Sequence, residues 1–180
     1  MELIAALDKS FNHTHNVLLN VSPEHYASST PCSEWDLRAL LDHTIGVVHG
    51  LGCAAAGAQA GEFVLSDDPA GQFRAAADAA LAAWSTPGVM EQIITAGAGP
   101  MPGSVLAGIN LLDTTTHAWD IATTLGRPAS VPDDVADVAL QQARAIIAPE
   151  IRPGRFADPV EPPADAGPTD LLVCFLGRRP

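Results

Sequence analysis

Apolar residues recur at helical spacing in four long stretches of the chain. In residues 2–21, for example, Leu3, Leu7 and Phe11 fall on one face of a helix. The other stretches are residues 33–60, 67–86 and 104–125, and each is followed by glycine or by proline and glycine, which end helices. Acidic residues after Pro132 open a fifth predicted helix that continues to about residue 148. The pattern predicts a mainly helical protein.

The segments between and after these helices carry their own signals. Ser33 followed by Asp36 has the spacing of a capping box, which predicts that the second helix begins at Ser33. Residues 89–96 are predicted to form a short strand or an extended crossover, and the glycine- and proline-rich residues 97–103 a loop. Residues 149–169 predict an irregular, proline-rich tail, and a last apolar segment follows at residues 171–176.

These elements predict an all-α fold, a four-helix bundle with an extra C-terminal helix and an irregular proline-rich tail. The 180 residues suit one domain spanning 1–180, with the tail from about residue 149. Hydrophobic residues make up 47% and charged residues 17%, which is typical of a globular chain.

The charge balance excludes several classes of partner. Nine Lys and Arg against 21 Asp and Glu give a formal net charge of −12. Binding to nucleic acid or to anionic lipid rests on clustered basic residues, so we expect neither partner. We find no apolar run long enough for a membrane span and expect no signal peptide. The three cysteines are odd in number and widely spaced, which favours a reducing cytoplasm.

The fourth predicted helix carries unusual polar residues on its apolar side. Asn110, Asp113 and His117 fall close to one line along it, and Asp113 and His117 are near enough to share a metal ion. His43, between apolar neighbours of the second helix, offers a third ligand. Two histidines and one carboxylate leave open positions on a divalent metal, as catalytic sites do. The alternatives are a surface ion pair and a histidine that is simply buried and hydrogen-bonded.

Three motifs give these residues a context. Residues 30–43 read TPCSEWDLRALLDH, residues 113–122 read DTTTHAWDIA, and residues 171–180 read LLVCFLGRRP. In this order they resemble the DinB-like superfamily. More narrowly, they resemble its small stand-alone actinobacterial metal-binding branch, which is related to the mycothiol-dependent maleylpyruvate isomerase N-terminal domain. The resemblance implies a four-helix DinB fold with a metal held by His43, Asp113 and His117.

Two departures from the thiol-dependent isomerase bear on function. That enzyme has Glu where this chain has Asp113, so the carboxylate here is shorter by one methylene. It also has an additional C-terminal domain, which we do not expect in this chain, so a function that needs that domain cannot be transferred.

Further residues have two open interpretations each. Asp36 either caps the second helix or supports a metal ligand from outside the ligand set. Asp120 either orients a ligand histidine or makes an ordinary buried hydrogen bond. Asn110 either contacts substrate or has a capping or packing role. Cys32 is expected to be structural. Arg178 and Arg179 either bind an anionic substrate or are solvated or ion-paired.

Of the four remaining histidines, His13, His15 and His25 are expected to lie mostly at the surface, and His49, six residues after His43, is not expected to share its ion. Trp35 and Trp119 are expected to be packing residues.

The leading hypothesis is a cytoplasmic metal-binding protein that works as an enzyme. The metal is expected to be Zn²⁺, with Ni²⁺, Mn²⁺ and Fe²⁺ as alternatives, and the resemblance implies mycothiol as co-substrate in an S-transfer or isomerisation. The rival hypotheses are a metal-dependent hydrolase and a non-catalytic ligand-binding protein. The expected partner is a small-molecule substrate, and a homodimer is left open.

Overall fold

A computed structural model describes residues 2–97 and 99–180. The described chain is mostly helical, with six α-helices and one small two-stranded sheet. The all-α class predicted from the pattern is therefore right in its broad form. None of the described helices combines the length and apolar character that crossing a bilayer requires.

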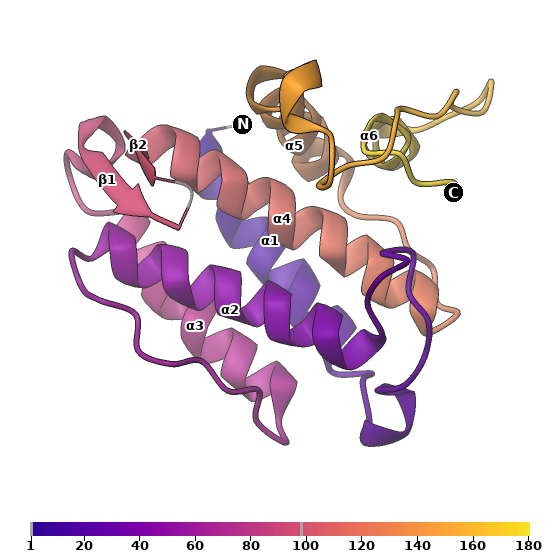
Figure 1. The fold of residues 1–180 in the computed structure, drawn as a ribbon, viewed down its shortest axis with the longest axis horizontal. Coiled ribbons are helices and arrows are strands. Elements are labelled where there is room, and N and C mark those ends of the chain that lie inside the picture. The colour runs from indigo at the N-terminus through magenta and orange to yellow at the C-terminus, as the bar shows by residue number, and fades with distance from the viewer. Residues whose placement is uncertain (1, 98) are drawn as a thin grey trace.

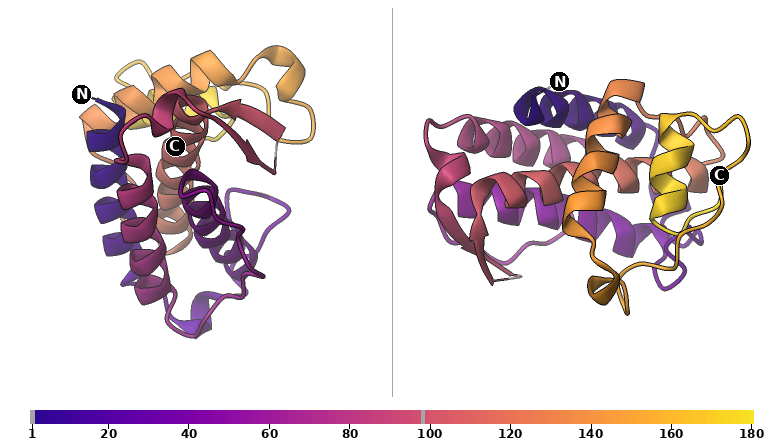
Figure 2. Two further views of the ribbon diagram at one scale, coloured as in Figure 1. Left: turned by 90° about the vertical axis from the view of Figure 1, so that its left-hand side faces the viewer. Right: turned by 90° about the horizontal axis from the view of Figure 1, so that it is seen from above.

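Four helices run roughly along one direction and bury their apolar faces against one another (Figures 1 and 2). They are α1 (Leu3–Leu18), α2 (Leu37–Ala55), α3 (Pro69–Trp84) and α4 (Gly103–Thr124). α1 packs on α3 and α4, and α2 packs on the same two helices. Within this group each helix thus has two helical neighbours, and the core lies among all four.

Two shorter helices cross this group. α5 (Asp133–Ile146) packs on α4, α1 and α6, and α6 (Pro168–Phe175) follows the irregular residues after α5. Figure 2 (right) shows α5 and α6 lying across α4. The crossing of α4 and α5 is close at Gly108, where an added Cβ would clash with the Gln142 side-chain oxygen.

The second helix begins later and ends earlier than predicted. Its N-cap is Asp36, whose Oδ1 accepts a 2.8 Å hydrogen bond from the Ala39 amide, so the predicted start at Ser33 is wrong. Residues before Asp36 form a turn of their own. The helix ends at Ala55 because Gly57 adopts a left-handed φ of 70°, which stops it before the predicted residue 60.

The predicted loop at residues 97–103 is also wrong in part. β2 (Gly99–Pro102) pairs antiparallel with β1 (Ile93–Ala96), so the two segments form a hairpin at one end of the helices (Figure 1). Prolines at 100 and 102 fit here because a two-stranded sheet has only edge strands, where a missing N–H is tolerated.

Candidate metal centre

The facing sides of α2 and α4 bring three ligand-type side chains together. His43 Nε2 lies 3.0 Å from Asp113 Oδ1, and His117 Nε2 lies 3.5 Å from the same oxygen. The two imidazole rings meet edge to face, with centroids 5.1 Å apart. One donor atom from each residue lies within 4.8 Å of those from the other two, so one cation can reach all three.

Burial in this group increases from α2 towards α4. The side chain of His43 is 33% exposed, that of Asp113 16% and that of His117 10%. The second carboxylate oxygen of Asp113, Oδ2, is buried and has no hydrogen-bond partner among the described residues. A buried carboxylate oxygen without a donor destabilises the folded state, because it loses its hydrogen bonds to water and no protein donor replaces them.

The protonation of His43 depends on Asp113. Burial alone would lower the pKa of His43, but the hydrogen bond that His43 donates to Asp113 and the negative charges of Asp113 and Asp42 outweigh it, so the pKa of His43 is raised. Without a metal, therefore, His43 favours a proton shared with the carboxylate.

The far nitrogen of His117 is held by a buried carboxylate. His117 Nδ1 lies 2.9 Å from Asp120 Oδ2, which fits the i, i+3 spacing of the two residues on α4. Because Nδ1 donates this proton, the lone pair of Nε2 faces Asp113 and His43. Asp120 is fully buried, and although burial raises its pKa, hydrogen bonds from His117 and Arg178 lower it to about 2.

The turn before α2 covers one side of this arrangement. The Thr30 hydroxyl donates to the carbonyls of Cys32 and Trp35 and accepts from the Cys32 amide, which folds the segment tightly. Trp35 then packs against His43, with ring centroids 4.6 Å apart and the ring planes tilted by 43°. The indole thus borders the ligand group, a contact beyond the packing role expected from the sequence.

A second set of ligand-type groups adjoins the first. Cys32, His117 and Asp120 also converge within 4.8 Å. The guanidinium of Arg178 already occupies this set, with Nη2 2.8 Å from Asp120 Oδ2 and 3.3 Å from Cys32 Sγ. Because a fixed positive charge lies there, the set is unsuited to a cation. Burial, followed by the charge of Asp120, raises the pKa of Cys32 to about 12, so Cys32 is also a poor source of thiolate.

Other residues with predicted roles lie elsewhere. The carboxylate of Asp36 is exposed and caps α2, and Asn110 is buried with its Oδ1 accepting a 3.2 Å hydrogen bond from Trp84 Nε1. His15 Nδ1 contacts the Ala70 carbonyl. None of these residues belongs to either ligand group.

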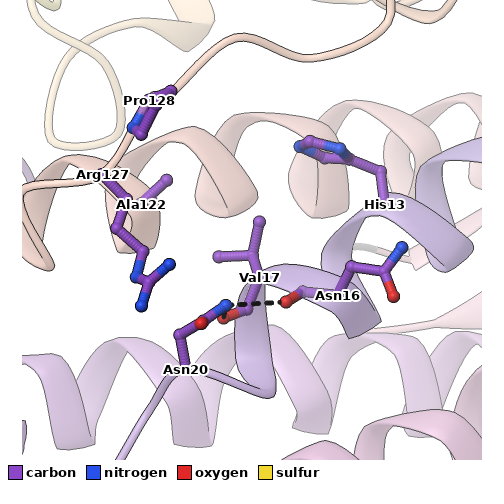
Figure 3. Close-up of a pocket in the computed structure, with 7 residues that line it drawn as sticks. All are labelled: His13, Asn16, Val17, Asn20, Ala122, Arg127 and Pro128. Atoms are coloured by element: carbon purple, nitrogen blue, oxygen red, sulfur yellow. Dashed lines mark hydrogen bonds between the residues drawn. The ribbon is translucent and has the colours of Figure 1, made fainter.

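Two other histidines, His25 and His13, lie in a turn after α1 and beside an open pocket. His25 Nδ1 accepts from the Ser22 amide. His13, on α1, lines an open pocket of about 260 Å³ that also includes Asn16 and Arg127 (Figure 3). This pocket contains none of the three candidate ligands.

Sequence reasoning did not assign Arg178 or Trp35 to the surroundings of the ligands. Trp35 belongs to the same motif as His43, so its place in that motif was an available signal. Arg178 belongs to the third motif and was expected to bind an anion or to be ion-paired, but nothing in the sequence identified its partner, Asp120, which lies 58 residues away.

Comparison with known proteins adds an independent observation. The family model described as the mycothiol maleylpyruvate isomerase N-terminal domain matches residues 9–122, a range that contains all three candidate ligands. Two uncharacterized proteins of Mycobacterium tuberculosis, MT0763 of strain CDC 1551 / Oshkosh and Rv0738 of strain ATCC 25618 / H37Rv, are each 34% identical over 164 residues, with 90% of this chain and 90% of each relative covered. A search of solved structures found no significant match.

Proposed function

Because the chain belongs to the mycothiol maleylpyruvate isomerase N-terminal domain family, we propose that it is a divalent-metal-binding DinB-like protein. In this proposal α1 to α4 form the four-helix bundle of that fold. His43, Asp113 and His117 bind one ion, which is zinc, with Ni²⁺, Mn²⁺ and Fe²⁺ as alternatives.

One observation carries the metal assignment. Two imidazole nitrogens and a carboxylate oxygen from α2 and α4 converge, and the other oxygen of that carboxylate is buried without a hydrogen-bond donor. A shared cation would compensate the charge of Asp113 and give its unpartnered oxygen a neighbour of opposite charge. The donor set of two nitrogens and one oxygen suits zinc and the neighbouring first-row divalent metals.

The proposed activity is that of an enzyme acting on a low-molecular-weight thiol such as mycothiol, in an S-transfer or a thiol-assisted isomerisation. A zinc ion with three protein ligands keeps an open position and lowers the pKa of a thiol that binds there, which supplies a thiolate at neutral pH. The chain's own contribution is orientation. Asp120 fixes the Nδ1 proton of His117, and Trp35 packs against the ring of His43.

The same proposal includes the partners and the cellular location of the protein. The partner is a small organic substrate in the cytoplasm, with neither nucleic acid nor membrane involved. Whether two copies pair is a separate question that a sedimentation measurement answers.

Elemental analysis of protein purified without a histidine tag is the first test. We expect about one divalent ion per chain, retained in the wild type and lost in His43→Ala. If the protein contains well under one ion per chain, and adding Zn²⁺, Ni²⁺ or Mn²⁺ does not restore it, the proposed site is contradicted.

Cobalt substitution then tests the thiol step. Adding mycothiol, or a simpler thiol in excess, should produce a sulfur-to-cobalt charge-transfer band in the near ultraviolet. Cys32→Ser is the matched control, because a band that persists in this variant comes from the added thiol and not from the nearby cysteine. A spectrum that ignores every thiol would favour the hydrolase or the non-catalytic binding protein.

A further inference from the structure

We propose that Arg178 is a positioning residue for the metal site, because it fixes the carboxylate of Asp120 and, through it, the ring of His117. The inference deepens the proposed function and rests on it for the identity of His117 as a ligand. Arg178 also lies outside the range that the family model matches.

The contact between Arg178 and Asp120 is a two-point ion pair in a nearly dry setting. Arg178 Nε lies 2.9 Å from Asp120 Oδ1, and Arg178 Nη2 lies 2.8 Å from Asp120 Oδ2. The Asp120 side chain is 0% exposed and that of Arg178 12%. Two parallel bonds from a planar guanidinium fix both the position and the rotation of the carboxylate, which a single bond would not do.

The rotation of Asp120 matters because one of its oxygens has a second task. Oδ2 accepts from His117 Nδ1 at 2.9 Å while it also accepts from Arg178. If the carboxylate turned, His117 would lose its fixed acceptor and its ring could flip or change tautomer. The Nε2 lone pair would then no longer face Asp113 and His43.

The turn at the end of α6 fixes the position of Arg178. After α6, the Gly177 amide donates to the Cys174 carbonyl and the Arg178 amide to the Val173 carbonyl, which is the Schellman pattern of a helix end. Gly177 has a φ of 84°, and an added Cβ would lie 2.6 Å from the Ala157 Cβ. The turn therefore requires glycine, and it directs the next side chain towards α4.

The neighbouring arginine provides the matched control. Arg179 has the same charge and adjoins Arg178 in sequence, but it is exposed. Replacing either residue by glutamine removes one positive charge from the same segment. A general effect of charge would appear in both variants, whereas a positioning effect appears only at Arg178.

The first readout is metal affinity, measured in the full chain by competition with a chelator. We expect R178Q to bind Co²⁺ about 10- to 100-fold more weakly, with a changed visible spectrum, because outer partners of a ligand histidine have effects of that size. R179Q should match the wild type. R178K keeps the charge without the two-point contact, so it should recover part of the affinity, and it also carries the test if R178Q does not fold.

A double variant shows whether the effect passes through Asp120. In an Asp120→Asn background, R178Q should change cobalt affinity by no more than about twofold, because the residue through which it acts is already altered. Full additivity of the two effects would overturn the proposal.

The second readout needs no metal. A proton–nitrogen correlation spectrum of the imidazole rings, recorded on metal-free protein at alkaline pH, should show His117 with its proton on Nδ1. R178Q should show a mixture of tautomers. An unchanged tautomer together with unchanged cobalt affinity in R178Q would refute the inference. If the wild type binds no metal but the tautomer responds to R178Q, the positioning stands and the proposed function fails.

Discussion

Replacing His117 by alanine should abolish metal binding and leave the fold intact. The magnitude follows from what the ring contacts. His117 makes one hydrogen bond to a charged group, the 2.9 Å contact from Nδ1 to Asp120, and its loss costs about 1.5–3 kcal/mol. The ring also packs edge to face on His43, so a small cavity adds to this cost.

Whether the variant stays folded depends on the partners that Asp120 keeps when His117 is removed. An uncompensated buried carboxylate would cost about 3–5 kcal/mol, but both bonds from Arg178 persist in the variant, so this penalty is not incurred. A domain of this kind has a free energy of unfolding of about 5–15 kcal/mol. The variant should therefore remain folded, with a lower urea midpoint and an unchanged slope.

The assay compares two histidine variants in the metal-free state. His13 is partly buried on α1 and lies outside both ligand groups, so His13→Ala controls for loss of a histidine as such. Urea unfolding followed by circular dichroism gives the stability of each variant, and chelator competition gives the metal affinity. His13→Ala should retain about wild-type affinity, and His117→Ala should bind no metal.

Two results would refute this reasoning. If His117→Ala is unfolded even without denaturant, the histidine is a structural element or the metal is needed for folding. If it still binds one ion as tightly as the wild type, the ligand set is wrong.

Three further changes test other parts of the description. Cys32→Ser should leave metal content unchanged, because Arg178 occupies that side of the cluster, and elemental analysis showing a loss like that of a ligand variant would contradict it. Asp36→Ala should lower the free energy of unfolding by about 1 kcal/mol through loss of the α2 cap, whereas Ser33→Ala should not; equal urea midpoints for the two would mean that the cap contributes nothing. Gly177→Ala should destabilise the protein more than Gly154→Ala in thermal unfolding, because both have positive φ but only the former lacks room for a Cβ; the reverse order would contradict the close contact.

Periodicity was a good guide to the helices and a weaker one to their ends. The capping-box spacing at Ser33 competed with a true cap three residues later at Asp36. Both residues are good N-caps, and the choice depends on the Thr30 hydroxyl, which folds the preceding residues into a separate turn. The hairpin was missed because its second strand contains two prolines and a glycine, which locally favour a loop, and only pairing with residues 93–96 makes it a strand.

Part of the candidate site could also be predicted from the sequence, and part could not. Asp113 and His117 are four residues apart on one helix, so their meeting follows from helical geometry alone. His43 required the packing of α2 on α4, which the motif resemblance implied and periodicity could not supply. The ion pair between Asp120 and Arg178 depends on how the segment after α6 returns to α4, and no local rule of sequence gives that path.

The contact between Trp35 and His43 gives the protein its own optical reporter. An indole with its centroid 4.6 Å from that of a candidate ligand is close enough for a paramagnetic ion at the site to quench its fluorescence. Trp84 and Trp119 are buried in α3 and α4 and supply a background emission. Occupancy of the site can therefore be followed in unlabelled protein by emission intensity during a cobalt titration, with Trp35→Phe as the reference that shows the background of the other two tryptophans.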